Sequence, residues 1–298
     1  MGQVMASPSS PREPIRIAAI TVSYGSADVL PTLLDSIAGA STTPILTIVA
    51  DNKPDSDDGV HELVIARGAR YLPLSRNVGY GGAVNAAAAT LPPSINWLLV
   101  VNPDVVLSPG SVDTLAETGQ EDAAIATVGP ATLTSDGTVY PSARAVPSLR
   151  TGVGHALFAN LWLDNPWTRA YRDDTTASPV RRDAGWVSGS CLLIRRSAFD
   201  RVGGFDDGYF MYFEDVDLGY RLGKLGFRNV YEPAAVVTHT GAHATTSESG
   251  RMISAHHDSA RRFLTRKYSG ALLWPVRVSL TIGLRLRSAL VRRRLNRQ

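Results

Sequence analysis

The feature that most constrains this chain is an alternation of short apolar runs with helix-patterned segments, which begins at residue 15. The apolar, strand-like runs cover residues 15–24, 44–52, 70–74 and 97–101. The helical patterns between them cover residues 28–40, with Asp28 as the expected N-cap, 57–67 and 81–90. This order predicts an α/β fold with a mixed, mostly parallel sheet flanked by helices. Ligands of such sheets bind beyond the carboxyl ends of the strands.

The second half of the chain has a weaker pattern. From about residue 130 the alternation loosens, and residues 141–183 are expected to be loop with short helices. A strand is expected over residues 186–195, a helix over 214–225, a strand over 229–239 and a helical region from Arg251 onward. The single cysteine, Cys191, excludes an intramolecular disulfide and a zinc site built from several cysteines.

Charge is divided unevenly along the chain. From Arg261 to the end there are Lys and Arg residues but no Asp or Glu, whereas acidic residues outnumber basic ones before Arg261. Apolar residues, including Trp274, recur among these arginines, which is typical of an amphipathic helix on an anionic membrane surface. Packing against the domain and nucleic-acid binding are the alternatives, although the apolar residues among the arginines are mostly aliphatic, whereas nucleic-acid binding needs base-stacking aromatics. No apolar run is long enough to predict a membrane-spanning helix.

Polar side chains follow two of the expected strands. Asp51 and Asn52 end one strand, and Asn102-Pro103-Asp104 follows another. A carboxylate at the position of Asp104 suits a divalent cation, and Asp51 suits a hydrogen bond from a base or a ribose. Taken by itself, each motif favours ordinary turn chemistry over a binding site.

A glycine-rich loop at residues 76–82 leads into the third expected helix. Backbone N–H groups and a helix N-terminus there can approach an anion, and Arg76 adds positive charge. The loop has neither the P-loop nor the dinucleotide-binding glycine spacing. A tight structural turn is the alternative.

An acidic cluster opens the helix that follows the aromatic residues 209–213. Glu214 and Asp215 suit a sugar site in which a carboxylate removes a hydroxyl proton. Because a helix turns about 100° per residue, the two side chains point in different directions and can do different work. A favourable acidic first turn is the alternative, and Asp217 with Arg221 is expected to be a surface pair. His239, at the end of a strand, is a candidate metal ligand.

Together these motifs resemble the family 2 inverting glycosyltransferases of the GT-A fold over residues 15–245. The resemblance depends on segments that occur in the order of the family: TVSY at 21–24, Asp51-Asn52, the loop with Asn77, Gly79 and Asn85, NPDV at 102–105, GSCLLIRR at 189–196, GGFD at 203–206, FEDVDL at 213–218, and His239. Residues 139–144, 165–167, 186–199 and 209–224 are similar to the actinobacterial rhamnosyltransferases of this family, which add L-rhamnose to GlcNAc-diphospho-polyprenol.

The resemblance implies a donor site for dTDP-rhamnose with Mn²⁺ or Mg²⁺ as cofactor. Asp104 stands at the second acidic position of the family's D-x-D motif, where Asn102 replaces the first Asp, so the metal would be held by Asp104 and His239. Asp51 would read the pyrimidine base. The implied donor-binding residues are Thr21, Ser23, Asp51, Arg76, Asn77, Gly79, Asn102 and Asp104.

The resemblance also implies how the acceptor is bound and activated. Asp215 would be the general base of a single in-line displacement with inversion, with Glu214 as the other catalytic candidate. The implied acceptor-binding residues are Trp186, Ser188, Gly189 and Glu214.

The implied organisation is a flexible lead-in at 1–14, a GT-A domain at 15–250 and a membrane-associating helical tail at 251–298. The domain would divide into a nucleotide-sugar half, 15–130, and an acceptor half, 131–250. A step in making the cell-wall linker between arabinogalactan and peptidoglycan would place the enzyme on the cytoplasmic face of the plasma membrane. The alternatives are transfer of galactofuranose or mannose, and a non-catalytic nucleotide-sugar-binding protein; assembly as a homo-oligomer stays open.

Overall fold

The structure is a computed structural model that describes residues 14–53, 58–148, 180–241, 249–275 and 278. Its first half is a regular parallel sheet in the order β3-β2-β1-β4. The strands are β1 (Ile17–Ser23), β2 (Leu46–Asp51), β3 (Arg70–Pro73) and β4 (Trp97–Val101). All four lie within the predicted strand ranges, and β1, β2 and β4 are apolar runs of the length that a buried strand needs.

The second half extends this sheet in mixed orientation. β11 (Cys191–Arg195) lies antiparallel between β4 and β6 (Ile125–Leu133), and β12 (Arg228–His239) runs parallel to β6. The short strands are β5 (Val105–Leu107), β7 (Val139–Tyr140) and β9 (Arg182–Ala184) in the same sheet, with β8 (Ala143–Arg144) and β10 (Trp186–Val187) paired in a second one. The predicted α/β class with a mixed, mostly parallel sheet is confirmed.

One predicted strand, 186–195, is divided in two. β10 and β11 belong to different sheets, and residues 188–190 turn between them. The reason is local: Ser-Gly-Ser has low strand propensity and supplies hydroxyls that bond to nearby backbone groups. This interruption places a polar loop where a continuous strand had been expected.

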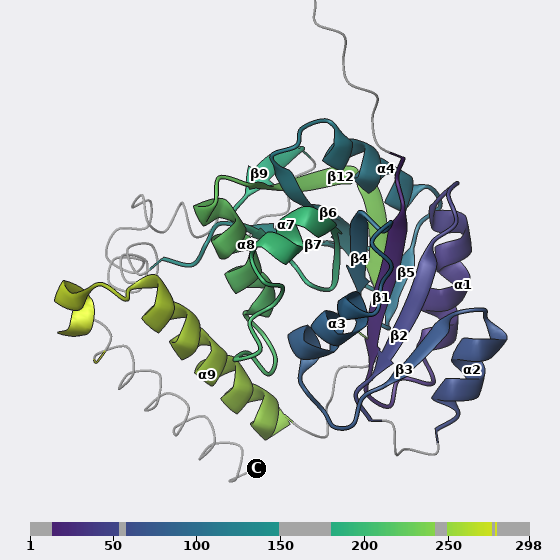
Figure 1. The fold of residues 1–298 in the computed structure, drawn as a ribbon, viewed down its shortest axis with the longest axis horizontal. Helices are drawn as coiled ribbons and strands as arrows, with labels where there is room; N and C mark the ends of the chain where they lie inside the picture. Colours follow the sequence, from purple (N-terminus) through teal and green to yellow (C-terminus); the bar gives the residue numbers. More distant parts are fainter. Residues whose placement is uncertain (1–13, 54–57, 149–179, 242–248, 276–277, 279–298) are drawn as a thin grey trace, which may run out of the picture.

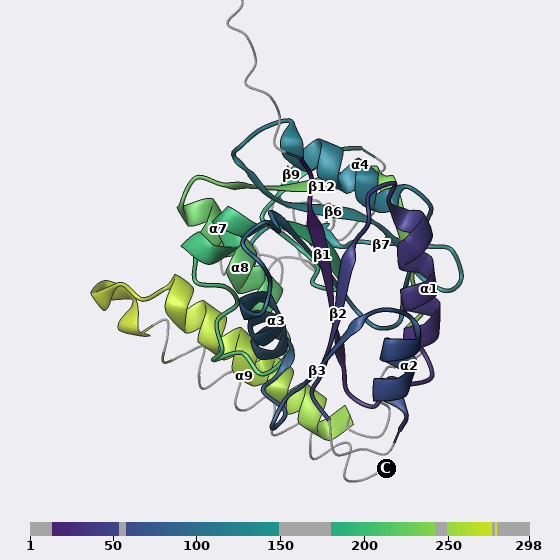
Figure 2. The ribbon, with the colours of Figure 1, turned by 45° about the vertical axis from the view of Figure 1, so that its right-hand side comes forward.

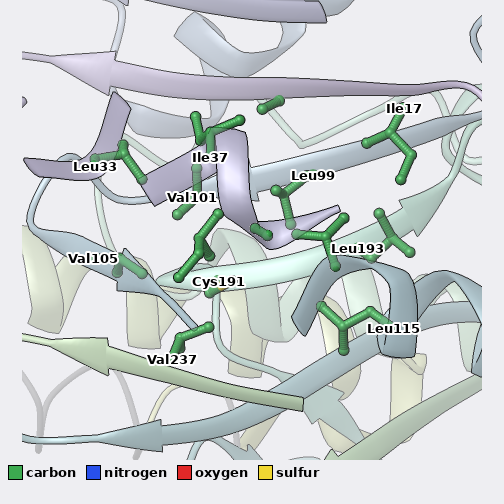
Figure 3. Packing of buried hydrophobic residues seen from close by; sticks show 14 of the residues in the cluster. Ile17, Leu33, Ile37, Leu99, Val101, Val105, Leu115, Cys191, Leu193 and Val237 are labelled. Atoms are coloured by element: carbon green, nitrogen blue, oxygen red, sulfur yellow. The ribbon is translucent and has the colours of Figure 1, made fainter. Parts of the chain in front are cut away.

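Helices cover both faces of the main sheet (Figures 1 and 2). α1 (Leu30–Ala40), α2 (Val60–Ala66) and α4 (Ser111–Gln120) pack on one face. Figure 3 shows Leu33 and Ile37 of α1 and Leu115 of α4 among the apolar side chains of the strands. α3 (Tyr80–Ala89), α7 (Arg196–Arg201) and α8 (Glu214–Lys224) pack on the other. Asp28 is not the cap of α1, since that helix follows Val29 without a side-chain cap.

The last described helix, α9 (Ser249–Lys267), lies on the same side of the molecule as α3 and α8 (Figures 1 and 2). Its Phe263 is fully buried and packs with Phe213 and Tyr220 of the α8 region. A short 3₁₀ helix, Ala271–Leu273, follows. Residues 276–277 and 279–298 of the predicted membrane-associating tail, and residues 1–13 of the lead-in, lie outside the described residues. Among the helices of the described ranges, none is long and apolar enough to cross a membrane.

Candidate active site

The polar strand ends meet at one edge of the main sheet. Ser23 at the end of β1 pairs with Asp51 at the end of β2. β11 runs the other way, so its first residue, Cys191, pairs with Val101 at the end of β4. His239 ends β12, which is parallel to β6. Strand direction therefore gathers the predicted donor and metal residues at the carboxyl edge, as expected for an α/β sheet.

Asp51 is held in a fixed orientation in the floor of this edge. It is 2% exposed, and its Oδ2 accepts the hydroxyl of Tyr71 at 2.7 Å while its Oδ1 accepts the N–H of Lys53 at 2.9 Å. Burial and this hydrogen bond raise the pKa of Tyr71, so the phenol remains a donor. Each carboxylate oxygen keeps a second lone pair for a ligand N–H.

Thr21 and Ser23 lie on one face of β1, two residues apart. Both side chains are buried, and neither hydroxyl has a hydrogen-bond partner among the residues that the structure describes. Buried polar groups normally have partners. Two orphan hydroxyls next to Asp51 are therefore consistent with a polar ligand or water at this point.

The glycine-rich loop is shaped by its own neighbours. Asn52 bonds to it twice, since its Nδ2 donates to the carbonyl of Gly79 at 3.1 Å and its Oδ1 accepts the N–H of Val78 at 3.2 Å. Asn77 accepts the N–H of Gly79 at 2.9 Å, and Arg76 is exposed beside it.

Gly79 is required by the fold at this position. Its φ is +80°, and a Cβ there would stand 2.3 Å from the carbonyl oxygen of Phe210. The neighbouring Tyr80 N–H donates to that same oxygen at 3.1 Å. The loop predicted for the donor therefore touches the segment that precedes the acidic pair.

Asp104 and His239 come together although they are far apart in the sequence. His239 Nε2 lies 3.0 Å from Asp104 Oδ1, and the main chain of Thr240 bonds to the carbonyl of Asp104. Asp104 is 8% exposed. In the described part of the chain there is no group of three or more His, Cys, Asp or Glu side chains that could hold a metal. Asp104 and His239 are the two protein ligands that the resemblance implies for the metal.

The loop at residues 188–190 connects the two halves of the site. Asn102 N–H donates to the carbonyl of Ser190 at 2.8 Å, and the hydroxyls of Ser188 and Ser190 lie 3.1 Å apart. Gly189 N–H donates to Asp215 Oδ2 at 2.8 Å. The loop thus contacts the segment of Asp104 on one side and the acidic pair on the other.

Glu214 and Asp215 have different surroundings. Glu214 is 7% exposed, and its Oε2 has no hydrogen-bond partner among the described residues. Burial, then the charge of Asp215, raises the pKa of Glu214 to about 8. Burial also raises the pKa of Asp215, but the N–H groups of Gly189 and Val216 oppose that rise. Of the two carboxylates, Asp215 is better able to carry the negative charge at neutral pH.

A strained turn leads into this pair. Tyr212 and Phe213 both have φ of +67°, a region that residues with a Cβ seldom occupy. α9 holds the turn, because His256 packs edge-on against both aromatic rings and Ser259 Oγ donates to the carbonyl of Met211 at 2.9 Å. Strain of this kind persists only where packing enforces it, and it clusters at functional sites.

The pair of Asp217 and Arg221, expected at the surface, is buried. Asp217 is fully buried and bonds to Arg221, to Arg266 of α9 at 3.3 Å and to the hydroxyl of Tyr209 at 3.4 Å. Arg221 also donates to the carbonyls of Val202 and Gly204. The surface prediction was wrong because the i,i+4 spacing does not show which helix face is covered.

Trp186, predicted to bind the acceptor, packs against the middle of α8. Its indole N–H donates to the carbonyl of Ala145 at 3.1 Å, and its Cβ lies against Gly219 of α8. Its N–H group therefore already has a partner within the protein.

Three residues of this region were not among the predicted site residues. Asn52 holds the glycine loop, Tyr71 orients Asp51, and Tyr80 donates its hydroxyl to the carbonyl of Gly189 at 2.8 Å. Asn52 had a signal, its place beside Asp51 at a strand end. The two tyrosines had none, because their partners are 20 and 109 residues away in the sequence.

Comparison with known proteins bears on this geometry in two ways. The family model described as "Glycosyltransferase like family 2" matches residues 14–257. The N-acetylglucosaminyl-diphospho-decaprenol L-rhamnosyltransferase of Mycobacterium tuberculosis is 43% identical over 286 residues, which cover 92% of each chain. Rhamnosyltransferase WbbL of Escherichia coli is 45% identical over a shorter stretch, 28% of this chain and 31% of its own.

Solved structures with little sequence similarity have the same fold. The mannosyltransferase PcManGT from Pyrobaculum calidifontis, in complex with GDP-Man and Mn²⁺, aligns with a TM-score of 0.56 at 15% identity over 92% of this chain and 70% of its own. GalNAc-T7, with UDP, GalNAc and Mn²⁺, aligns with a TM-score of 0.54 at 15% identity over 91% of this chain and 54% of its own.

Proposed function

This chain belongs to glycosyltransferase family 2, and from that premise we propose that it transfers L-rhamnose from dTDP-rhamnose to GlcNAc-diphospho-polyprenol. Among the observations, the one that carries the proposal is the bond from Gly189 to Asp215 in a loop that also bonds to Asn102. This loop sets a candidate base beside a candidate diphosphate site. The choice of sugar and acceptor is supported by the 43% identity to the mycobacterial enzyme named for that reaction.

The donor set of Asp104 and His239 fits a divalent cation such as Mn²⁺ or Mg²⁺. A carboxylate oxygen and an imidazole nitrogen 3.0 Å apart are both metal ligands, and such cations are commonly held by few protein ligands together with substrate phosphates. When bound there, the cation neutralises charge that develops on the departing diphosphate. Because Asn102 stands in place of an acidic residue, Asp104 and His239 are the protein ligands that we propose for the cation.

Asp215 acts as the general base in this proposal. Two backbone N–H groups favour its ionised form, and it is less buried than Glu214. Glu214, with its pKa raised to about 8, keeps a proton near neutral pH and donates it in a hydrogen bond to the acceptor sugar. Two neighbouring carboxyl groups thereby take the two different roles that their helix positions permit.

The reaction is a single displacement. Asp215 takes the proton of an acceptor hydroxyl as the oxygen forms a bond to C1 of rhamnose. The bond from C1 to the diphosphate oxygen breaks on the opposite face, so the anomeric configuration is inverted and dTDP leaves. No covalent enzyme intermediate is needed.

Donor recognition is assigned to the ends of β1 and β2. Asp51 accepts the N–H of the thymine ring, and the orphan hydroxyls of Thr21 and Ser23 lie near it for the nucleoside. Arg76 and Asn77 are exposed on the glycine loop, within the donor half. Ser188 and Gly189 contribute to the acceptor side.

We also propose that the region after α9 binds an anionic membrane on the cytoplasmic face, where the lipid-linked acceptor is used. Leu272 and Trp274 are 94% and 60% exposed just beyond α9. The following residues add arginines without acidic residues. Apolar and aromatic side chains beside a basic segment suit a membrane interface.

The decisive experiment is transfer of labelled sugar to synthetic GlcNAc-diphospho-polyprenol. dTDP-rhamnose is compared with UDP-galactofuranose and GDP-mannose, each with Mn²⁺, with Mg²⁺ and with a chelator. We expect lipid-linked label from dTDP-rhamnose alone, and its loss with the chelator. Label from another donor would replace the sugar assignment, and dTDP binding without transfer from any donor would favour a nucleotide-sugar-binding protein.

A further inference from the structure

Tyr80, the first residue of α3, is linked to the proposed base through a single glycine. Its hydroxyl donates to the carbonyl of Gly189 at 2.8 Å, and the N–H of the same glycine donates to Asp215 Oδ2 at 2.8 Å. A Cβ built on Gly189 would lie 3.6 Å from the ring of Tyr80 and 3.5 Å from Cβ of Asp215. Gly189 is therefore held between the two side chains.

Glycine makes this arrangement sensitive to its partners. A residue without Cβ turns its carbonyl and N–H more freely than any other. The carbonyl of Gly189 is bonded to Tyr80, while the next residue, Ser190, is bonded to Asn102 at 2.8 Å. Loss of the first bond would leave the orientation of the Gly189 N–H to the flexible Ser-Gly-Ser turn.

We infer that Tyr80 is a positioning residue for the acceptor base: its hydroxyl fixes Gly189, and Gly189 fixes Asp215. The inference rests on the proposed function, in which Asp215 takes the acceptor proton. Tyr80 acts through Gly189 and touches neither substrate in this account. A helix of the donor half thereby sets the orientation of a carboxylate in the acceptor half.

The electrostatics agree with this geometry. Burial, followed by the charges of Glu214 and Asp215, raises the pKa of Tyr80 well above its usual value, so the hydroxyl stays protonated and can donate. The titratable groups around Tyr80 on the packed elements are Glu214 and Asp215 on α8, Cys191 on β11 and Asp104.

The hydrogen bond from the Gly189 N–H favours the ionised form of Asp215. It lowers the pKa of Asp215, against the rise caused by burial. If Gly189 turns away, the pKa of Asp215 rises. The acid limb of the rate profile then moves to higher pH, because the base must be ionised to accept a proton.

The test is Tyr80→Phe, which keeps the ring and removes only the hydroxyl. We expect kcat to fall about tenfold, with the KM for dTDP-rhamnose unchanged, since small misplacements of a reacting group have effects of this order or greater. The acid limb of kcat against pH should move to higher pH, because the N–H group that lowers the pKa of Asp215 is lost. Hydrogen exchange at residues 188–190 should become faster.

The matched control is Tyr231→Phe, which removes the hydroxyl of a tyrosine that is 3% exposed in β12 and outside the site. It should change neither the acid limb nor exchange at residues 188–190. Asp215→Asn distinguishes a failure of the role of Tyr80 from a failure of the proposed function. If it abolishes transfer while Tyr80→Phe leaves rate, pH profile and exchange unchanged, the role of Tyr80 is overturned and the proposed function stands. If Asp215→Asn retains transfer, the base assignment itself is overturned, and with it this inference.

Discussion

The donor and acceptor sides of the site are built in different ways. The donor side lies at the ends of parallel strands whose register brings Ser23 next to Asp51. The acceptor side follows two residues with φ of +67° and needs contacts from α9 to hold them. Regular backbone orients the first set of side chains, whereas packing from a distant helix orients the second. The acceptor side should therefore respond more strongly to changes far from the chemistry.

The two sides are not independent. Gly79 of the donor loop approaches the carbonyl of Phe210, and Tyr80 bonds to the same oxygen. Because of this contact, a displacement of the glycine loop would displace the segment that precedes the acidic pair. The following variants separate the contributions of the two sides, and we order them by expected effect.

The largest effect should come from the acceptor side with Asp215→Asn. Removing the base should lower kcat by roughly 10²–10⁴-fold, because general base catalysis contributes about that much. Binding of dTDP should be unchanged by calorimetry, since Asp215 belongs to the other side. Asp183→Asn, an exposed carboxylate of β9 that pairs with Arg228, is the control. Loss of dTDP binding in Asp215→Asn would contradict the separation of the two sides.

Phe263→Ala tests the dependence of the acceptor side on α9. Phe263 is fully buried between Phe213 and Tyr220, so truncation should lower the free energy of unfolding by about 3–5 kcal/mol, measured by urea denaturation. Transfer activity should be lost at a lower urea concentration than dTDP binding. Leu272→Ala, at a side chain that is 94% exposed, should change stability by less than about 0.5 kcal/mol. If the two variants changed the free energy of unfolding equally, the packing of α9 would not stabilise the domain.

On the donor side, Asp51→Asn should raise the KM for dTDP-rhamnose about tenfold and leave kcat within about twofold, because a charge-assisted hydrogen bond to the base is lost. The amide also cannot accept from both Tyr71 and Lys53 as the carboxylate does. Initial-rate kinetics across donor concentrations measure the split. The control is Asp35→Asn, which affects a surface pair with Arg67. A fall in kcat without a change in KM would place Asp51 outside donor recognition.

The smallest effect concerns Glu214 and pH. The folded protein holds the proton of this carboxyl to about pH 8, whereas the unfolded chain releases it near 4.5. Stability should therefore decrease as pH rises from about 5 to 8, and Glu214→Gln should remove that loss. Between these pH values, the melting temperature of the wild type relative to the variant should fall by roughly 3–6 °C. A constant difference would mean that Glu214 is ionised in the folded protein.

Sequence patterns were sufficient for the regular part of the molecule. The strands β1, β2 and β4 were found because they are apolar and lead into polar residues, and Asp51 and Asp104 were found by their places at those ends. The meeting of Asp104 with His239 was implied only by the family resemblance, and the structure places the two side chains in contact.

The rest depended on contacts that leave no local pattern. The burial of Asp217 is decided by a neighbour that is remote in the sequence, Arg266 of α9. The same holds for the left-handed turn at Tyr212 and Phe213, since neither aromatic residue prefers that conformation. Tertiary packing overrides local preference at these points, as is common near functional sites.

The separation of Asp104 from His239 has a consequence for biosynthesis. The two residues are 135 positions apart, and His239 ends β12, the last strand of the described sheet in chain order. A nascent chain on the ribosome therefore carries β1, β2, β3 and β4 well before it carries β12. Asp104 has no contact with His239 until β12 has been translated and paired. An unfinished protein can thus hold Ser23 and Asp51 on neighbouring strands while it still lacks half of the Asp104–His239 pair.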